Sequence, residues 1–164
     1  MNGVIEEAKR WKAAAFTRWQ KDKTMNKKDA FAQFGVVQLN ERWSWSGVSE
    51  DQRTLVLTLW TDQYQFDKET KIHHWSTFNC DSERWVNDHG NSHRIRDIQF
   101  ALEHLEGRFR GIAVTPDSSQ LPERVILTGS VKPLLHLEWQ ITDFDPATGE
   151  CSGTSFPERR PFTR

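Results

Sequence analysis

Two kinds of side chain in this sequence could bind a ligand: indole rings, which stack on flat groups, and guanidinium groups, which hold anions. The chain has eight tryptophans and ten phenylalanines but one tyrosine. Trp43 and Trp45 are separated by one residue, so in a strand both indoles face the same side. The pair predicts a platform on which a planar base stacks, at about 1–3 kcal/mol per base. The alternative is that these indoles belong to the core.

Further candidates for the same pocket follow the platform along the chain. They are Trp60 and Asp62 at the end of an apolar run, and then Tyr64, Trp75, Arg84 and Trp85 in a stretch rich in loop-forming residues. Loops beside rigid strands often hold ligands. Trp75 and Trp85 stand among polar residues, so the pattern favours the pocket and the core equally for these two.

Four arginines complete the predicted binding surface. Arg94 and Arg96 stand at the start of a predicted helix, where guanidinium groups and free backbone N–H donors together suit a phosphate. The alternative is a solvated pair that meets nearby acidic residues, with a stabilisation below about 1 kcal/mol. Arg108 and Arg110 alternate along a predicted strand and could flank the same surface.

Metal and cofactor sites are not predicted. His89 and His93 are four residues apart, but Gly90 and Asn91 between them favour a turn, and no further ligand stands at a firm spacing. The chain has no P-loop, no dinucleotide-binding glycine pattern and no metalloprotease motif. Two cysteines exclude a disulfide framework, and reduced thiols are expected.

Length and composition indicate one globular domain. The chain has 164 residues and 27% charged residues, and no window reaches the roughly 18 apolar residues of a membrane span. The N-terminus lacks the basic start and apolar run of a signal peptide, so a cytoplasmic location without membrane contact is expected. Residues 1–34 hold 8 basic and 4 acidic side chains, whereas the rest is acidic overall within a net charge of -1. A nucleic-acid site would therefore depend on local cations.

Hydrophobic periodicity predicts an α+β domain over residues 1–156, with a helical arm over 1–35 and a flexible tail over 157–164. Two N-terminal helices are expected, one with an apolar stripe from Val4 to Trp19 and a short one ending at Gly35. A later helix presents Ile95, Ile98, Leu102 and Leu105 on one face, with Asn91 or Ser92 as its cap. Runs at 36–39, 42–46, 54–60, 72–78, 109–115, 124–128 and 134–142, with a last short strand after Gly149, predict about seven or eight strands. These strands would form a bent mixed sheet or an open β-barrel with the helices packed outside.

The order of these features resembles the modified-DNA reading domains of type IV restriction endonucleases, especially the sulfur-binding domains that recognise phosphorothioate DNA. The resemblance covers about residues 36–130 and rests on the stretches 43–46, 56–62, 94–98 and 106–110. Only Trp60, Asp62, Arg94 and Arg96 stand where that family's pattern would place them. It implies a reader that binds DNA and examines a chemical mark in a partly aromatic pocket. Because the chain has no nuclease motif, cleavage would require a separate nuclease or another protein partner.

Three functional hypotheses follow. The first is a non-enzymatic nucleic-acid reader that recognises modified DNA in bacterial or phage restriction or defence. The second is a protein-interaction module that uses exposed tryptophans, with the Val4–Trp19 stripe docking on a partner or a second copy. The third is a small-ligand binder or an enzyme that uses Asp62, His74 or His93 in an aromatic cleft.

Overall fold

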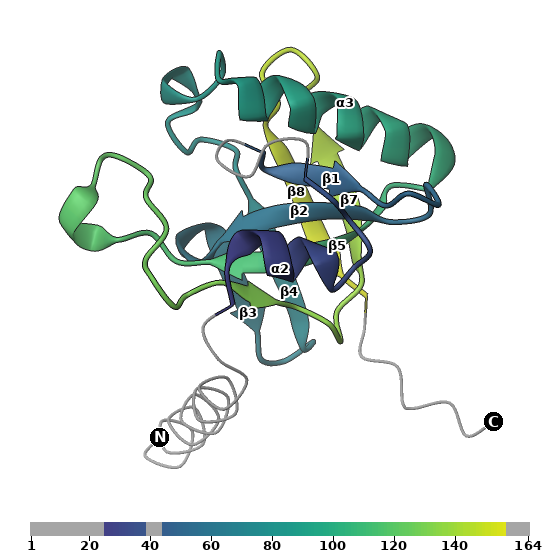
Figure 1. Ribbon diagram of the computed structural model, residues 1–164, viewed down its shortest axis with the longest axis horizontal. Coiled ribbons are helices and arrows are strands. Elements are labelled where there is room, and N and C mark those ends of the chain that lie inside the picture. The colour runs from purple at the N-terminus through teal and green to yellow at the C-terminus, as the bar shows by residue number, and fades with distance from the viewer. Residues whose placement is uncertain (1–24, 39–43, 157–164) are drawn as a thin grey trace.

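The computed structural model describes residues 25–38 and 44–156, and in this part of the chain eight strands form one mixed sheet (Figure 1). The strand order is β1–β2–β5–β7–β8–β4–β3, with β6 paired to β5 beside this path. The strands are β1 Ser46–Val48, β2 Leu55–Trp60, β3 Tyr64–Asp67, β4 Ile72–Ser76, β5 Arg108–Val114, β6 Lys132–Pro133, β7 Trp139–Phe144 and β8 Cys151–Ser155. β2 and β5 are parallel, and the other paired strands are antiparallel. The predicted α+β class and strand number are confirmed, and the sheet does not close.

The sheet changes neighbours along β5. The second part of this strand pairs with β2, where Arg110 lies opposite Val56 and Val114 opposite Trp60. Its first two residues pair instead with β7, where Phe109 lies opposite Trp139. β5 therefore joins the part of the sheet that contains β2 to the part that contains β7.

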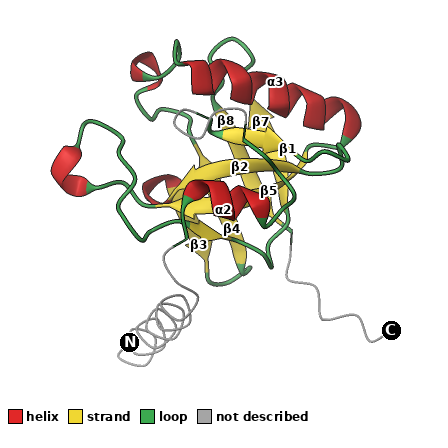
Figure 2. Ribbon diagram, viewed as in Figure 1, coloured by secondary structure: helices red, strands yellow, loops and turns green. Residues whose placement is uncertain are grey.

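In the part of the sheet around β2 and β5, each face is covered by one helix (Figure 2). The helices are α2 Lys27–Ala32 and α3 His89–His104, and the single-turn 3₁₀ helices are η1 Thr61–Gln63, η2 Ser82–Arg84 and η3 Ser118–Gln120. Leu57 and its neighbours two residues away belong to the core under α3, which includes Ile98. Val56 belongs to the core that contains Phe31 of α2. Because both faces of β2 are covered, its sequence is apolar at every position but Thr58.

Helix α3 starts earlier than the sequence indicates, at His89 with Asp88 as the N-cap residue. Its buried positions include Arg94, Ile98 and Ala101, at spacings of four and three. An arginine thus takes a place on the inner stripe of the helix. The predicted stripe through Leu102 is wrong in register, because that side chain is 44% exposed.

The N-terminal prediction is met in one part. The short helix ending before Gly35 is α2, and its cap residue Asn26 accepts a hydrogen bond from the N–H of Asp29 at 2.8 Å. The other helix, predicted over Val4–Trp19, lies outside the described residues, as do Trp43 and the tail 157–164. Two N-terminal helices are therefore not confirmed.

Three predicted strands need correction. Residues 44 and 45 precede β1, which begins only at Ser46, although the carbonyl of Trp45 still accepts a hydrogen bond from the N–H of Thr58. Residues 36–38 and 124–128 form no named strand. The second of these segments makes one isolated bridge, from Ile126 to Pro116, and belongs to the loop that carries η3 and projects from the sheet (Figure 2).

Candidate functional site

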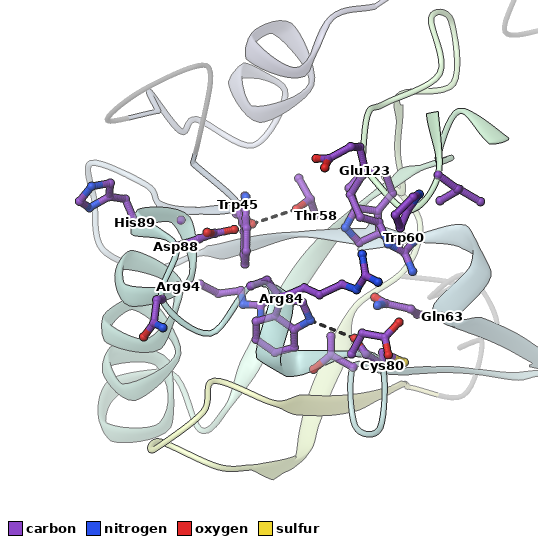
Figure 3. A pocket seen from close by; sticks show the side chains of 18 residues that line it. Trp45, Thr58, Trp60, Gln63, Cys80, Arg84, Asp88, His89, Arg94 and Glu123 are labelled. Atoms are coloured by element: carbon purple, nitrogen blue, oxygen red, sulfur yellow. Dashed lines mark hydrogen bonds between the residues drawn. The ribbon is translucent and has the colours of Figure 1, made fainter. Parts of the chain in front are cut away.

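A pocket of about 910 Å³ lies where the end of β2, the start of α3 and two loops meet (Figure 3). Pockets that bury small ligands have volumes of about 300–1,000 Å³. Its lining residues are Trp45, Thr58, Trp60, Gln63, Thr77, Cys80, Asp81, Arg84, Trp85, Asn87, Asp88, His89, Gly90, Arg94, Leu121, Pro122, Glu123 and Arg124. Three indoles and three guanidinium groups therefore share one cavity, and five of these six residues were candidates from the sequence.

Arg94 is the most deeply buried charged group of the pocket. Its side chain is 4% exposed, and its guanidinium carbon lies 5.0 Å from the ring centroid of Trp45 and 5.2 Å from that of Trp85. Nη2 donates hydrogen bonds to Oδ1 of Asn91 at 3.2 Å and to the carbonyl of Gly149 at 3.3 Å. Both acceptors are neutral. Burial lowers the pKa of Arg94 to about 10, so the group remains charged at neutral pH.

The two indoles beside Arg94 contact each other, and one of them is held by a backbone carbonyl. Trp45 and Trp85 meet edge to face, with centroids 6.2 Å apart and planes at 71°. The indole N–H of Trp85 donates to the carbonyl of Cys80 at 3.0 Å, which fixes the ring against the loop between β4 and α3. This loop contains η2, and its Asp81 has a left-handed backbone conformation that reverses the chain. Trp45 therefore comes from the residue just before β1, and Trp85 comes from the loop between β4 and α3.

The opposite wall of the pocket contains a second arginine–indole pair. The guanidinium carbon of Arg124 lies 5.3 Å from the ring centroid of Trp60, and its Nη1 donates to a carboxylate oxygen of Asp62 at 2.8 Å. This ion pair ties the loop that carries η3 to the turn after β2. Figure 3 shows Trp60 and Glu123 on this side, across from Trp45 and Arg94.

The charges of the pocket balance. Its lining contains the three arginines Arg84, Arg94 and Arg124 and the three carboxylates Asp81, Asp88 and Glu123. The pocket is consequently not a broad cationic surface of the kind that clamps a duplex. Its cations are placed singly, and two of them lie against indole rings.

Two aromatic candidates belong to the core instead of the pocket. Trp75 is 1% exposed and packs against Phe109, with ring centroids 6.0 Å apart. Trp75 was a candidate for the ligand site but does not line this pocket, because β8 and the core cover it on β4. Tyr64 packs edge to face on Trp139 and shares a short hydrogen bond with His73 Nδ1. Burial raises the pKa of Tyr64, so the phenol stays protonated.

The remaining arginine candidates lie away from the pocket lining. Arg96 is exposed, because two residues along a helix turn a side chain to the other face from Arg94. Arg108 pairs with Glu138 at 3.4 Å, and Arg110 Nε donates to the carbonyl of Leu137 at 3.0 Å. The predicted guanidinium pair of Arg94 and Arg96 is thus split, and Arg84 takes the second place.

Groups for the enzymatic hypothesis do not gather at the pocket. Asp62 holds Arg124, and His93 Nδ1 lies 3.5 Å from a carboxylate oxygen of Asp97, whose other contacts include a 2.6 Å hydrogen bond from Ser46. His74 is exposed on β4. None of the three predicted residues is among those that line the cavity.

The described part of the chain contains neither a disulfide nor a cluster of metal-ligating side chains. Cys80 and Cys151 are free, and burial raises the pKa of Cys151 to about 12. Within residues 25–38 and 44–156, no group of three His, Cys, Asp or Glu side chains is placed to hold a metal ion. No helix in the same ranges is both long enough and apolar enough to cross a membrane.

Exposed tryptophans, on which the interaction hypothesis depends, are missing from the described ranges. The five described indoles are buried or half-buried. The large exposed apolar side chains are Val37, Phe66, Leu102, Leu121, Val125, Leu127 and Leu135. Trp11 and Trp19 lie outside the described residues.

Arg124 and the first turn of α3, which begins at His89, are among the parts of the site that the sequence did not indicate. Arg124 is 62 residues from Asp62, and only the folded chain brings them together.

Comparison of the chain with known protein families, with curated proteins and with solved structures finds no match. The resemblance to modified-DNA readers therefore stays a prediction.

Proposed function

We propose that this domain is a non-enzymatic nucleic-acid reader whose pocket receives one base. The observation that carries the proposal is the meeting of three indoles, Trp45, Trp60 and Trp85, with arginines in one cavity of about 910 Å³. A base enters such a cavity only after it leaves its stack, which is least costly in a single strand or at a damaged or modified position. The domain is therefore proposed to read an unpaired or modified base in bacterial or phage restriction or defence.

The arrangement of rings and guanidinium groups limits how the base sits. Arg94 lies over Trp45 and Trp85, and Arg124 lies over Trp60. A base therefore stacks on an uncovered ring face or on a guanidinium plane, and both contacts are used by proteins that bind single strands. The neighbouring carboxylates Asp81, Asp88 and Glu123 offer acceptors for exocyclic amino groups.

The balanced charge of the lining sets the expected salt dependence. A reader that depends on one pocket neutralises few phosphates, and each phosphate contact contributes a slope of about −0.9 to a plot of log affinity against log salt concentration. We expect a total slope of about −1 to −2. A value near −6 would indicate a surface clamp and contradict the pocket.

The test is a fluorescence titration with short DNA at two ionic strengths. Single strands and duplexes are compared, each unmodified, with methylated bases, or with phosphorothioate linkages. We expect quenching of tryptophan emission, and Trp60→Leu is expected to weaken binding about 10-fold or more because one stacking partner is lost. Phe66→Leu is the matched control, since Phe66 is an exposed aromatic residue outside the lining. No quenching with any strand, or equal affinity for Trp60→Leu and the wild type, would overturn the proposal.

A further inference from the structure

We infer that the α3 end of the pocket is a subsite for one phosphate group, held by Arg94 and Arg84. This inference rests on the proposed function, because the phosphate is that of the nucleotide whose base occupies the pocket. It adds an anchor of defined chemistry and position to the stacking site. The reader would then recognise a base together with a single backbone phosphate.

The first support is a buried charge without a partner of opposite sign. Among the described residues, Arg94 forms no ion pair, its Nη2 donates to two neutral oxygens, and its Nε has no hydrogen-bond partner. Buried guanidinium groups are otherwise almost always paired, since removing a charge from water is costly. A buried, unpaired positive charge that lines a cavity is the arrangement expected where the ligand itself carries the anion.

The second support is the orientation of α3. This helix of 16 residues begins at the pocket, and Asp88, His89 and Gly90 at its start belong to the lining. The Asp88 side chain makes no capping hydrogen bond. The start of a helix carries partial positive charge and N–H donors, and both favour an anion. Arg94 is five residues after His89, the first residue of the helix, and it lies on the same buried side as Gly90.

Arg84 supplies the second cation. It is exposed, belongs to η2 and lines the same cavity, and it forms no ion pair with the described part of the chain. Figure 3 shows Arg84 crossing the cavity beneath Trp45, between Arg94 on the helix side and Gln63 on the far side, with the end of its side chain turned toward Gln63 and Trp60. Two guanidinium groups can hold one phosphate through paired N–H donors. Asp81 and Asp88 are nearby carboxylates, and they oppose a second phosphate.

The experiment compares single strands of one sequence that differ at one linkage. One strand has native phosphodiesters, and in a series of others each linkage in turn is a neutral methylphosphonate. We expect one linkage, next to the bound base, at which neutralisation weakens binding about 10-fold or more, as for the loss of a charge-assisted contact. Other linkages should change the affinity less.

The arginines are then tested against the same strands. Arg84→Gln and Arg94→Lys should each weaken binding of the native strand and reduce the difference at that linkage to about 3-fold or less, because the anchor is already impaired. Arg84 is exposed, so its variant is not expected to affect folding. Arg53→Gln, an exposed arginine outside the lining, should keep the full difference.

The outcomes separate the inference from the proposed function. If strands quench the tryptophans but every methylphosphonate binds as tightly as the native strand, the phosphate subsite is wrong and the base pocket stands. If a sensitive linkage exists but Arg84→Gln and Arg94→Lys keep the full difference, the subsite is elsewhere. If no strand binds at all, both proposals fail.

Discussion

Replacement of Arg94 by methionine separates the role of this residue in binding from its role in folding. The pKa of the buried group is about 10 instead of the ordinary 12.5, and that difference corresponds to a penalty of about 3 kcal/mol on the charged form relative to the neutral form. Against this cost stand two long hydrogen bonds, at roughly 1 kcal/mol each, and two cation–π contacts, at roughly 0.5–1 kcal/mol each. The two sums nearly cancel.

Methionine fills a similar volume and makes sulfur–aromatic contacts with the same indoles. We therefore expect Arg94→Met to change the free energy of unfolding by less than about 1 kcal/mol in either direction. Ile98→Ala, one turn further on the same buried stripe, should cost about 2–5 kcal/mol because it leaves a cavity in the core. Urea denaturation followed by circular dichroism measures both values.

Binding is measured on the same Arg94→Met protein by quenching with a native single strand. We expect affinity to fall about 10-fold or more while the fold is kept. A loss of stability as large as that of Ile98→Ala, with affinity unchanged, would show that the guanidinium is a structural group. Arg94 would then not be an anchor for the phosphate of a ligand.

Three further predictions concern the surroundings of the pocket. Gly149 has φ +87° and its added Cβ would lie 2.2 Å from Asn91 Oδ1, so Gly149→Ala should cost about 1–3 kcal/mol in urea denaturation and also weaken binding through Arg94; unchanged affinity would contradict that linkage. Burial raises the pKa of the Asp97 carboxyl, so the protonated carboxyl stabilises the fold at acid pH, and this stabilisation is lost as pH rises through the folded pKa. The free energy of unfolding of Asp97→Asn relative to that of the wild type should therefore increase between about pH 4 and pH 7, and a decrease would contradict the raised pKa. Cys80 lines the pocket and Cys151 is buried, so a thiol reagent should label Cys80 first and more slowly with bound DNA, whereas initial labelling of Cys151 would contradict the structure.

The parts of the fold that could be predicted are those that local pattern determines. The run over β2 is apolar at every position but Thr58, which predicts a strand covered on both sides. Gly107 after α3 has φ +71°, and its N–H donates to the carbonyl of Ala101, as expected for the end of a helix. The candidates Trp45, Trp60, Trp85 and Arg94 meet because each lies at or beside an end of such an element, where chain segments converge.

The parts that could not be predicted depend on partners distant in sequence. Trp75 stands between polar neighbours and looks like a surface residue, but it lies opposite Gly153 of β8, almost 80 residues later. A Cβ at Gly153 would meet the Phe109 ring at 2.8 Å, so the glycine is what allows the rings to pack so closely. No local pattern reveals this pairing. Likewise, the choice between Arg94 and Arg96 depends on where α3 contacts the sheet.

The position of Arg94 is the point at which local folding rules and the structure disagree. A helix that packs on a sheet normally places apolar side chains on its inner stripe, and Ile98 and Ala101 follow this rule. An arginine at the next inward position conflicts with it, and the conflict is not relieved by an ion pair within the described residues. Such local inconsistencies are expected at functional sites, because stability alone gives no reason to keep a charge at this position. Because Arg94 lines the cavity together with the two indoles that contact its guanidinium, the anion proposed to balance its charge reaches it from the pocket.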